Sequence, residues 1–257
     1  MVQARYGIDA PNLVRGFLLA GIGSGAAGFG LLVWADLKPS APWVVGLLLV
    51  VSAYALGMFG LMLRGSLVTK VRGRDNILDL INWTGRERVL DVGCGRGLLL
   101  VGAAHRLTTG HATGIDIWLQ RDQSSNEMAA PLENAKVEGV ADRVSVETGD
   151  MRKLPFSDGS FDVVVSSWAV HNLEREADRD RALAEMVRVL RPGGSILLND
   201  IANRGEYEME LRRLGLRNVR VVVESRWRDI TLSPVSFGSF RPATIVGHDR
   251  RPIESTS

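Results

Sequence analysis

Two long uncharged segments constrain the fold of this chain more than any other feature of its sequence. No charged residue occurs at positions 17–35 or 39–63 of the 257 residues. A helix of roughly 20 apolar residues is long enough to cross a bilayer. We therefore expect an N-terminal domain of residues 1–64 that holds two transmembrane helices, at about 14–35 and 41–63.

A literal G-x-G-x-x-G pattern lies inside the first uncharged segment, at residues 23–28. A dinucleotide-binding unit would need an amphipathic helix after this pattern and an acidic residue about 20 positions later, and the sequence has neither. In lipid, small residues on one helix face let two backbones approach closely. We expect Gly21, Gly25 and Gly28 to pack against the second helix or a second subunit. The alternative is a glycine-rich helix without specific packing.

The distribution of basic residues predicts the orientation of the hairpin. The connecting turn at 36–39 carries only Lys38, beside Asp36, whereas both outer flanks are richer in lysine and arginine. The positive-inside rule then places both outer flanks, and the rest of the chain, in the cytoplasm. The second span argues against a cleaved signal peptide. The flanking basic residues are Arg5, Arg15, Arg64, Lys70, Arg72 and Arg74.

Beyond a linker helix expected at 65–84, short apolar runs alternate with amphipathic segments. This alternation predicts an α/β domain with a parallel sheet covered by helices on both faces. We place the domain at 85–247, before a tail at 248–257. The expected strands are 89–92, 112–115, 144–147, 161–166, 195–198, 219–223 and 243–246, and the expected helices lie near 98–107, 126–138, 175–190 and 206–214.

The first of these strands runs into a glycine loop in "VLDVGCGRG", residues 89–97. Gly93, Gly95 and Gly97 alternate there, and leucine follows at position 98, so the spacing differs from the dinucleotide pattern. Glycines let a ligand approach the backbone, and the next helix points its N-terminal amides into the same crevice. We therefore expect a ligand outside the carboxyl ends of the strands.

Three acidic residues lie within or directly after the first three expected strands, namely Asp91, Asp116 and Asp150. Asp116 is placed to accept hydrogen bonds from both hydroxyls of a ribose, and Asp150 to accept one from an exocyclic adenine amine. Three negative charges suit a neutral or cationic nucleoside and repel a polyphosphate.

Four motifs together resemble the class I S-adenosylmethionine-dependent methyltransferases, in the branch of quinone C-methyltransferases and arsenite methyltransferases. They are "LDVGCGRG" (90–97), "GIDI" (114–117), "GDMRKLPFSDGSFDVVVSS" (149–167) and "RVLRPGGSILLND" (188–200). The resemblance covers roughly residues 72–247. It implies a seven-stranded Rossmann-like sheet whose last strand is antiparallel, and S-adenosyl-L-methionine as the cofactor.

The resemblance also implies which residues bind this cofactor. The glycine loop would hold its methionine part, and Cys94 within that loop is interpreted as a small filler residue. Trp118 is interpreted either as a stacking partner of the adenine or as a core residue. The implied cofactor-binding residues are Asp91, Gly93, Cys94, Gly95 and Gly97 at the methionine part, Asp116 at the ribose, Ile117 and Trp118 after it, Asp150 and Met151 at the adenine, and Ser166 near the sulfonium.

His171 follows the fourth strand and is our candidate for a general base, because histidine titrates near neutral pH. The alternative is a histidine that shapes the substrate site or supports the fold. Asn172 is a weaker candidate of the same kind. Catalysis in this family is mostly alignment of the acceptor with the methyl group. No histidine has partners at metal-ligand spacing, so no metal site is expected.

We therefore expect a membrane-anchored methyltransferase of an apolar or amphipathic acceptor, such as a quinone, an isoprenoid, a lipid or a hydrophobic thiol. A net charge of +2 gives no electrostatic case for nucleic acid. The segment 118–128 is expected to form a loop over the adenosine or the mouth of the substrate site, and the substrate cover is expected from the hairpin, residues 65–76 or residues 226–240. A homodimer through glycine-rich helix faces is the remaining expectation. The alternatives are a soluble acceptor with the hairpin as a tether, a non-catalytic cofactor-binding scaffold, and a nicotinamide oxidoreductase, which the glycine spacing disfavours.

Overall fold

The computed structural model describes residues 6–8, 10–35, 42–66, 70–119, 126–222 and 243–249. The chain divides into two compact units. One is helical and is drawn mainly from residues 7–70, and the other is an α/β unit that begins at residue 71 and also includes Tyr6. The expected turn at 36–39 and the expected cover at 226–240 lie outside the described residues.

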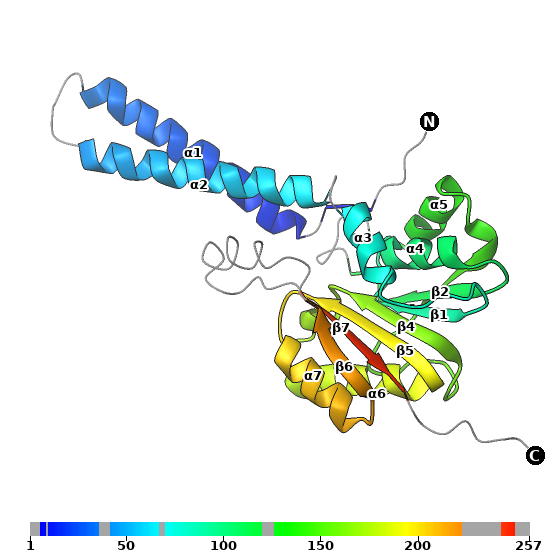
Figure 1. The fold of residues 1–257 in the computed structure, drawn as a ribbon. Coiled ribbons are helices and arrows are strands. Elements are labelled where there is room, and N and C mark those ends of the chain that lie inside the picture. Colours follow the sequence, from blue (N-terminus) through cyan, green and yellow to red (C-terminus); the bar gives the residue numbers. More distant parts are fainter. Residues whose placement is uncertain are drawn as a thin grey trace, which may run out of the picture. The chain divides into compact units, whose positions relative to one another are not determined.

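The helical unit is a hairpin of two apolar helices, α1 (Pro11–Ala35) and α2 (Pro42–Arg64) (Figure 1). Neither contains an acidic residue, and the only basic residues are Arg15 in α1 and Arg64 at the end of α2. Both helices are long and apolar enough to cross a membrane, by length and composition alone.

The glycine face of α1 packs against α2, as predicted. A Cβ added at Gly21 would lie 2.7 Å from the side chain of Leu56, and one at Gly25 would lie 2.9 Å from Ser52 Oγ. The Ser52 hydroxyl donates a hydrogen bond of 2.7 Å to the Gly21 carbonyl across this interface. Small residues are therefore required on this face for the two backbones to approach.

The linker helix is shorter than expected: α3 spans the nine residues Lys70–Leu78 and ends well before residue 84. The amides of Leu80 and Ile81 donate to carbonyls three residues back, so the hydrogen bonds tighten before the helix stops. The indole of Trp83 then donates to the Leu78 carbonyl at 2.8 Å.

The α/β unit is built on one seven-stranded sheet in the order β3-β2-β1-β4-β5-β7-β6. Six strands run in one direction, and β7 is antiparallel to both of its neighbours, as the resemblance implied. The strands are β1 (Arg88–Val92), β2 (His111–Asp116), β3 (Val144–Thr148), β4 (Phe161–Ser167), β5 (Leu190–Asp200), β6 (Arg217–Val222) and β7 (Ala243–His248).

Helices cover both faces of this sheet (Figure 1). Alternate residues along each strand enter opposite cores, so Val89 joins one buried cluster and Leu90 the other. Helix α5 begins three residues later than expected, because Asn126 bonds to Asp116 instead of starting the helix. The remaining helices are α4 (Leu98–Arg106), α5 (Ala129–Val137), η2 (Ala141–Arg143), η3 (Val170–Asn172), α6 (Glu176–Val189) and α7 (Arg204–Arg213).

Candidate active site

The glycine loop connects β1 to α4 at the carboxyl edge of the sheet. Gly93 has φ 71° and Gly97 has φ 80°, a left-handed conformation that glycine adopts without strain. A Cβ added at Gly93 would overlap the Cβ of Ala169 in the segment after β4. The loop therefore needs glycine both for its backbone path and for close contact with the segment that carries His171.

The carboxylate of Asp116 is held in place by three donors from this chain. One oxygen accepts the Gly95 amide at 2.8 Å, and the other accepts the Trp118 amide at 2.7 Å and the Asn126 side chain at 3.3 Å. The next residue, Ile117, is exposed. The arrangement fixes an acid at the end of β2, directly beside the glycine loop.

Trp118 has φ 59°, an uncommon conformation for a residue with a side chain. Its indole N–H donates to Thr148 Oγ at 2.8 Å, and its ring packs against the core cluster on the α4 side of the sheet. These contacts give Trp118 a packing role at the end of β2.

Asp91 is a buried acid one residue before the end of β1. Burial raises the pKa of Asp91 to about 8, against a partial opposing effect of a hydrogen bond from the Leu100 amide, and the nearby charge of Asp116 raises it further. Burial likewise raises the pKa of the Cys94 thiol, which keeps it protonated and unreactive. Cys94 Sγ would lie 2.7 Å from a Cβ added at Gly114 on β2, as a packed filler residue would.

Asp150 and Met151 follow β3. The guanidinium of Arg152 binds the Asp150 carboxylate at 2.5 to 3.1 Å and lowers its pKa. Met151 packs against the second core cluster, and its Cε would lie 3.5 Å from a Cβ added at Gly93. Arg152 is a neighbour of the site that the sequence analysis did not identify.

Ser166, near the end of β4, is almost fully buried. Its hydroxyl donates to the Val92 carbonyl at 2.7 Å and so ties the end of β4 to the end of β1. In the adjacent strand pair, Ser167 lies opposite Asn199 on β5. The carboxyl ends of β1, β4 and β5 are therefore aligned at one edge of the sheet.

His171 and Asn172 lie in the short helix η3, directly after β4. The His171 ring approaches the carboxylate of Asp200, with Nδ1 2.6 Å from Oδ1, and its backbone amide donates to Oδ2 at 3.1 Å. Asp200 is the last residue of β5, and sequence reasoning missed it. In the sequence, Asp200 is marked only by its place at the end of an apolar run, in "LLND" (197–200). The Asn172 amide donates to the Ala169 carbonyl at 3.2 Å.

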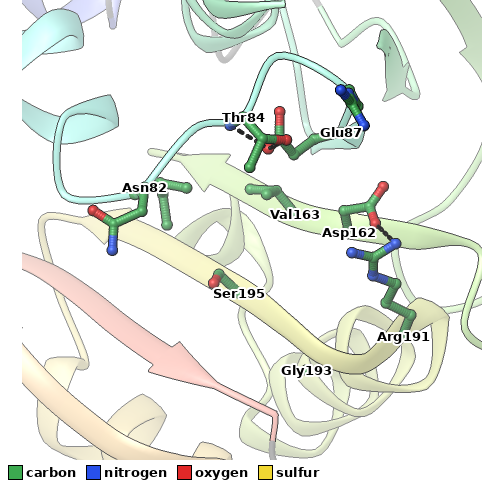
Figure 2. Close-up of a pocket in the computed structure, with 10 residues that line it drawn as sticks. Asn82, Thr84, Glu87, Asp162, Val163, Arg191, Gly193 and Ser195 are labelled. Atoms are coloured by element: carbon green, nitrogen blue, oxygen red, sulfur yellow. Dashed lines mark hydrogen bonds and ion pairs between the residues drawn. The ribbon is translucent and has the colours of Figure 1, made fainter. Parts of the chain in front are cut away.

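A cavity of about 380 Å³ lies at the opposite, amino edge of the sheet (Figure 2). The two acidic side chains that line this cavity already bind groups of the protein itself. Glu87 accepts the amide and hydroxyl of Thr84, both at 2.6 Å, and Asp162 accepts the Arg88 amide and pairs with Arg191. We therefore place the candidate site at the carboxyl edge. Within the described ranges, no group of three histidine, cysteine or acidic residues could hold a metal ion.

Comparison with known proteins agrees with this geometry. Residues 90–198 match a family described as "Methyltransferase domain". Methyltransferase GfsG from Streptomyces halstedii is 34% identical over 134 residues, which are 52% of this chain and 45% of that protein. The ubiquinone/menaquinone biosynthesis C-methyltransferase UbiE from Roseobacter denitrificans is 30% identical over 125 residues, covering 49% of this chain and 46% of that protein. The chain thus spans about half the length of these curated relatives.

Solved structures support the fold. Geranyl diphosphate C-methyltransferase from Streptomyces coelicolor superposes with a TM-score of 0.57 at 16% identity, covering 75% of this chain and 84% of that one. The carboxyl-edge residues also fit the cofactor, because acids suit a cationic nucleoside and the glycine loop leaves its backbone open to a ligand. Residues 90–198 therefore match the methyltransferase family, and the α/β unit has the fold of S-adenosylmethionine-dependent methyltransferases of known structure.

Proposed function

We propose that this chain is a membrane-anchored methyltransferase that transfers a methyl group to a small apolar or amphipathic acceptor. The observation that carries the proposal is the joining, in one chain, of a methyltransferase fold and a hairpin of two helices with the length and composition of membrane spans. The catalytic unit is then cytoplasmic, because the basic residues flank the outer ends of the hairpin.

In this proposal the cofactor binds along the carboxyl ends of β1 to β4. Asp91 and the loop from Gly93 to Gly97 hold the methionine part, and Asp116 holds the ribose. Three donors already orient the Asp116 carboxylate, so little conformational entropy is lost when a ligand binds to it. Asp150 and Met151 flank the adenine, and Ser166 supports the backbone near the sulfonium.

When bound, S-adenosylmethionine supplies a methyl group carried on positively charged sulfur. The residues of this chain align the acceptor, exclude water and, at His171, accept a proton. Alignment is the larger contribution, since correctly oriented reactants gain up to about 7–11 kcal/mol over free ones. Asn172, on the same turn of η3, contributes a polar group to the acceptor side.

The acceptor class rests on the membrane hairpin. An anchor does nothing for methyl transfer itself, but it keeps the catalytic unit near a bilayer, where quinones, isoprenoids, lipids and hydrophobic thiols are concentrated. The name of the UbiE relative points to ubiquinone and menaquinone biosynthesis for that protein, which supports a quinone among the candidate acceptors. A soluble acceptor with the hairpin as a mere tether is the second candidate.

A homodimer in the bilayer is part of the same proposal. Helix α1 carries a second face of small residues, exposed in the described part of the chain and distinct from the face that packs on α2. A second copy could approach this face closely in lipid. Its residues are Gly16, Ala20, Gly23, Ala27 and Gly30.

Methyl transfer from labelled cofactor to membrane extracts tests the proposal. The full chain, purified in detergent, should label compounds in the organic phase of a lipid extract and not those in the aqueous phase. The Asp116→Ala variant is the control, because it should lose cofactor binding. Label only in the aqueous phase would support the tether, and cofactor binding without any transfer would support a non-catalytic scaffold.

A further inference from the structure

Arg152 holds the acid two residues before it, Asp150, through both its backbone and its side chain. Its amide donates to Asp150 Oδ1 at 2.9 Å. Its guanidinium lies beside both carboxylate oxygens, with Nε 3.0 Å from Oδ1 and 3.1 Å from Oδ2, and Nη2 2.5 Å from Oδ2. One residue therefore fixes both the position and the rotation of the Asp150 carboxylate.

These contacts leave room on the carboxylate for one more donor. An ionised carboxylate only accepts hydrogen bonds, at about four lone-pair sites. Arg152 supplies three hydrogens, from its amide, Nε and Nη2. The hydrogen bonds from the Arg152 side chain outweigh burial and lower the pKa of Asp150, so this carboxyl is ionised at neutral pH. The remaining site therefore suits an N–H donor.

The guanidinium is held through its other nitrogen by Asp178 on α6. Arg152 Nη1 lies 3.6 Å from Asp178 Oδ2, and Arg175 Nε lies at the same distance from that oxygen. The Asp178 side chain is only 14% exposed, whereas that of Arg152 is 42% exposed. Arg152 therefore bridges a loop to the first turn of a helix, which limits the rotation of its long side chain.

Other residues anchor the backbone of the loop that follows β3. The Leu154 amide donates to Glu185 Oε2 at 2.8 Å, and Arg188 donates to the Leu154 carbonyl at 3.1 Å. Glu185 and Arg188 both belong to α6. The path of the loop is thus fixed beyond Arg152, and the specific effect of the Arg152 side chain is on the Asp150 carboxylate.

Asp150 also lies close to the acid that is proposed for the ribose. The Gly149 amide, one residue before Asp150, donates to the Asp116 carbonyl at 3.1 Å. From these contacts we infer that Arg152 is a positioning residue for cofactor binding: held by Asp178, it presents Asp150 to the exocyclic amine of the adenine. The inference rests on the proposed function, which places the adenine at Asp150, and it adds the two side chains that prepare this contact.

The expected effect depends on the adenine amine. A hydrogen bond to a charged group contributes at least about tenfold to affinity, so a ligand without the amine should bind more weakly by this factor. Ordering one flexible side chain on binding lowers affinity about threefold to tenfold. Without Arg152, Asp150 must be ordered when the amine binds. A ligand without the amine makes no use of Asp150 and should keep its affinity.

Titration calorimetry on the full chain in detergent compares S-adenosylhomocysteine with its 6-deamino analogue, in which hydrogen replaces the adenine amine. Wild type should prefer S-adenosylhomocysteine at least about tenfold. Arg152→Met should bind S-adenosylhomocysteine about threefold to tenfold more weakly, and the analogue as wild type does. Arg152→Lys should restore part of the loss, because lysine keeps the charge without the planar fork. Lys153→Met, at the next exposed position, is the matched control and should bind both ligands as wild type does.

Asp178→Asn tests the second contact. It should weaken S-adenosylhomocysteine binding less than Arg152→Met does, and it should add no loss to that variant, because Asp178 acts through Arg152. Equal losses with both ligands, or no loss in Arg152→Met, would overturn the inference and leave the proposed function intact. Equal binding of the two ligands by wild type would contradict the placement of the adenine at Asp150, and with it both proposals. Thermal unfolding checks each variant, and Arg152→Gln replaces Arg152→Met if the latter is unfolded.

Discussion

The buried acid Asp91 predicts a pH-dependent affinity for the cofactor. Burial raises its pKa from 3.8 to about 8, so the free protein keeps this carboxyl protonated at pH 6. In the proposed complex the methionine part brings a positively charged sulfonium and an ammonium group, which favour the carboxylate. Binding should therefore release a proton from Asp91 at any pH well below 8.

The size of the effect follows from the pKa. Removing a proton from a group with a pKa of about 8 costs about 1.4 kcal/mol for each pH unit below that value. Affinity should therefore rise about tenfold between pH 6 and pH 7, and about fiftyfold between pH 6 and pH 8. Above about pH 8 the cofactor loses its own ammonium charge, so the test belongs below that value.

Titration calorimetry in buffers of different ionisation enthalpy measures both quantities. Wild type should release close to one proton per bound cofactor at pH 6.5. Asp91→Asn should bind more weakly at pH 7, release no proton there or at pH 6.5, and show a flat pH profile below pH 7. Unfolding offers a second check with a definite sign. The unfolded state loses the Asp91 proton near pH 4 and the folded state keeps it, so stability without cofactor falls as pH rises from about 4 to 8. A pH-independent wild-type affinity without proton release would refute this account of Asp91.

Four further predictions concern other parts of the chain. Asp116→Ala should weaken cofactor binding at least tenfold, since a charge-assisted contact contributes about 1.5–3 kcal/mol, and unchanged affinity by calorimetry would remove this residue from the site. Gly25→Leu should destabilise the hairpin by about 1–3 kcal/mol in thermal unfolding, because its side chain would meet Ser52, while Gly57→Leu on α2, with nothing within 4 Å, is the matched control that should not. Lys38→Cys should react with an impermeant thiol reagent added outside intact cells, and Ser257→Cys should not. Labelling of Ser257→Cys alone would contradict the cytoplasmic placement of the α/β unit. Burial opposes ionisation of Glu138, but hydrogen bonds from Tyr6 and His105 and the charge of Arg74 lower its pKa overall. The ionised Glu138 therefore stabilises the fold above about pH 4.5, and this contribution is lost on acidification. Glu138→Gln should lower the free energy of unfolding at pH 7 by about 2 kcal/mol and make it depend less on pH below about 4.5.

The sequence predicted the sheet well because its signals are local. Each parallel strand is a short apolar run between polar turns, and six of the seven expected strands lie wholly within the observed ones. The strand at 195–198 begins earlier than predicted, at Leu190, because Leu190 pairs with Phe161 across an irregularity in β4. Pairing between distant segments, and not local composition, decides such a boundary.

The partners of the site acids were harder to predict for the same reason. Asp116 was found from its place after a strand, but Asn126, which bonds to it, was assigned to the following helix. Its amide is satisfied by a carboxylate ten residues away, which no helical pattern reveals. Arg152 illustrates a different limit, because an arginine two residues after an acid is common on any surface and becomes informative only when both side chains are seen together.

Asp200 shows how the fold turns an ordinary residue into part of a site. The sequence places it at the end of an apolar strand, one of several acids in such positions. Its contact with His171 depends on the pairing of β4 with β5, in which Ser167 lies opposite Asn199. This pairing lets η3, which follows β4, lie over the end of β5. A buried acid is costly unless it is well bonded, and Asp200 is bonded to one ring and two amides. The cost of burying this carboxylate is thus offset in large part by His171, and the contacts that stabilise the acid also hold the His171 ring in one orientation.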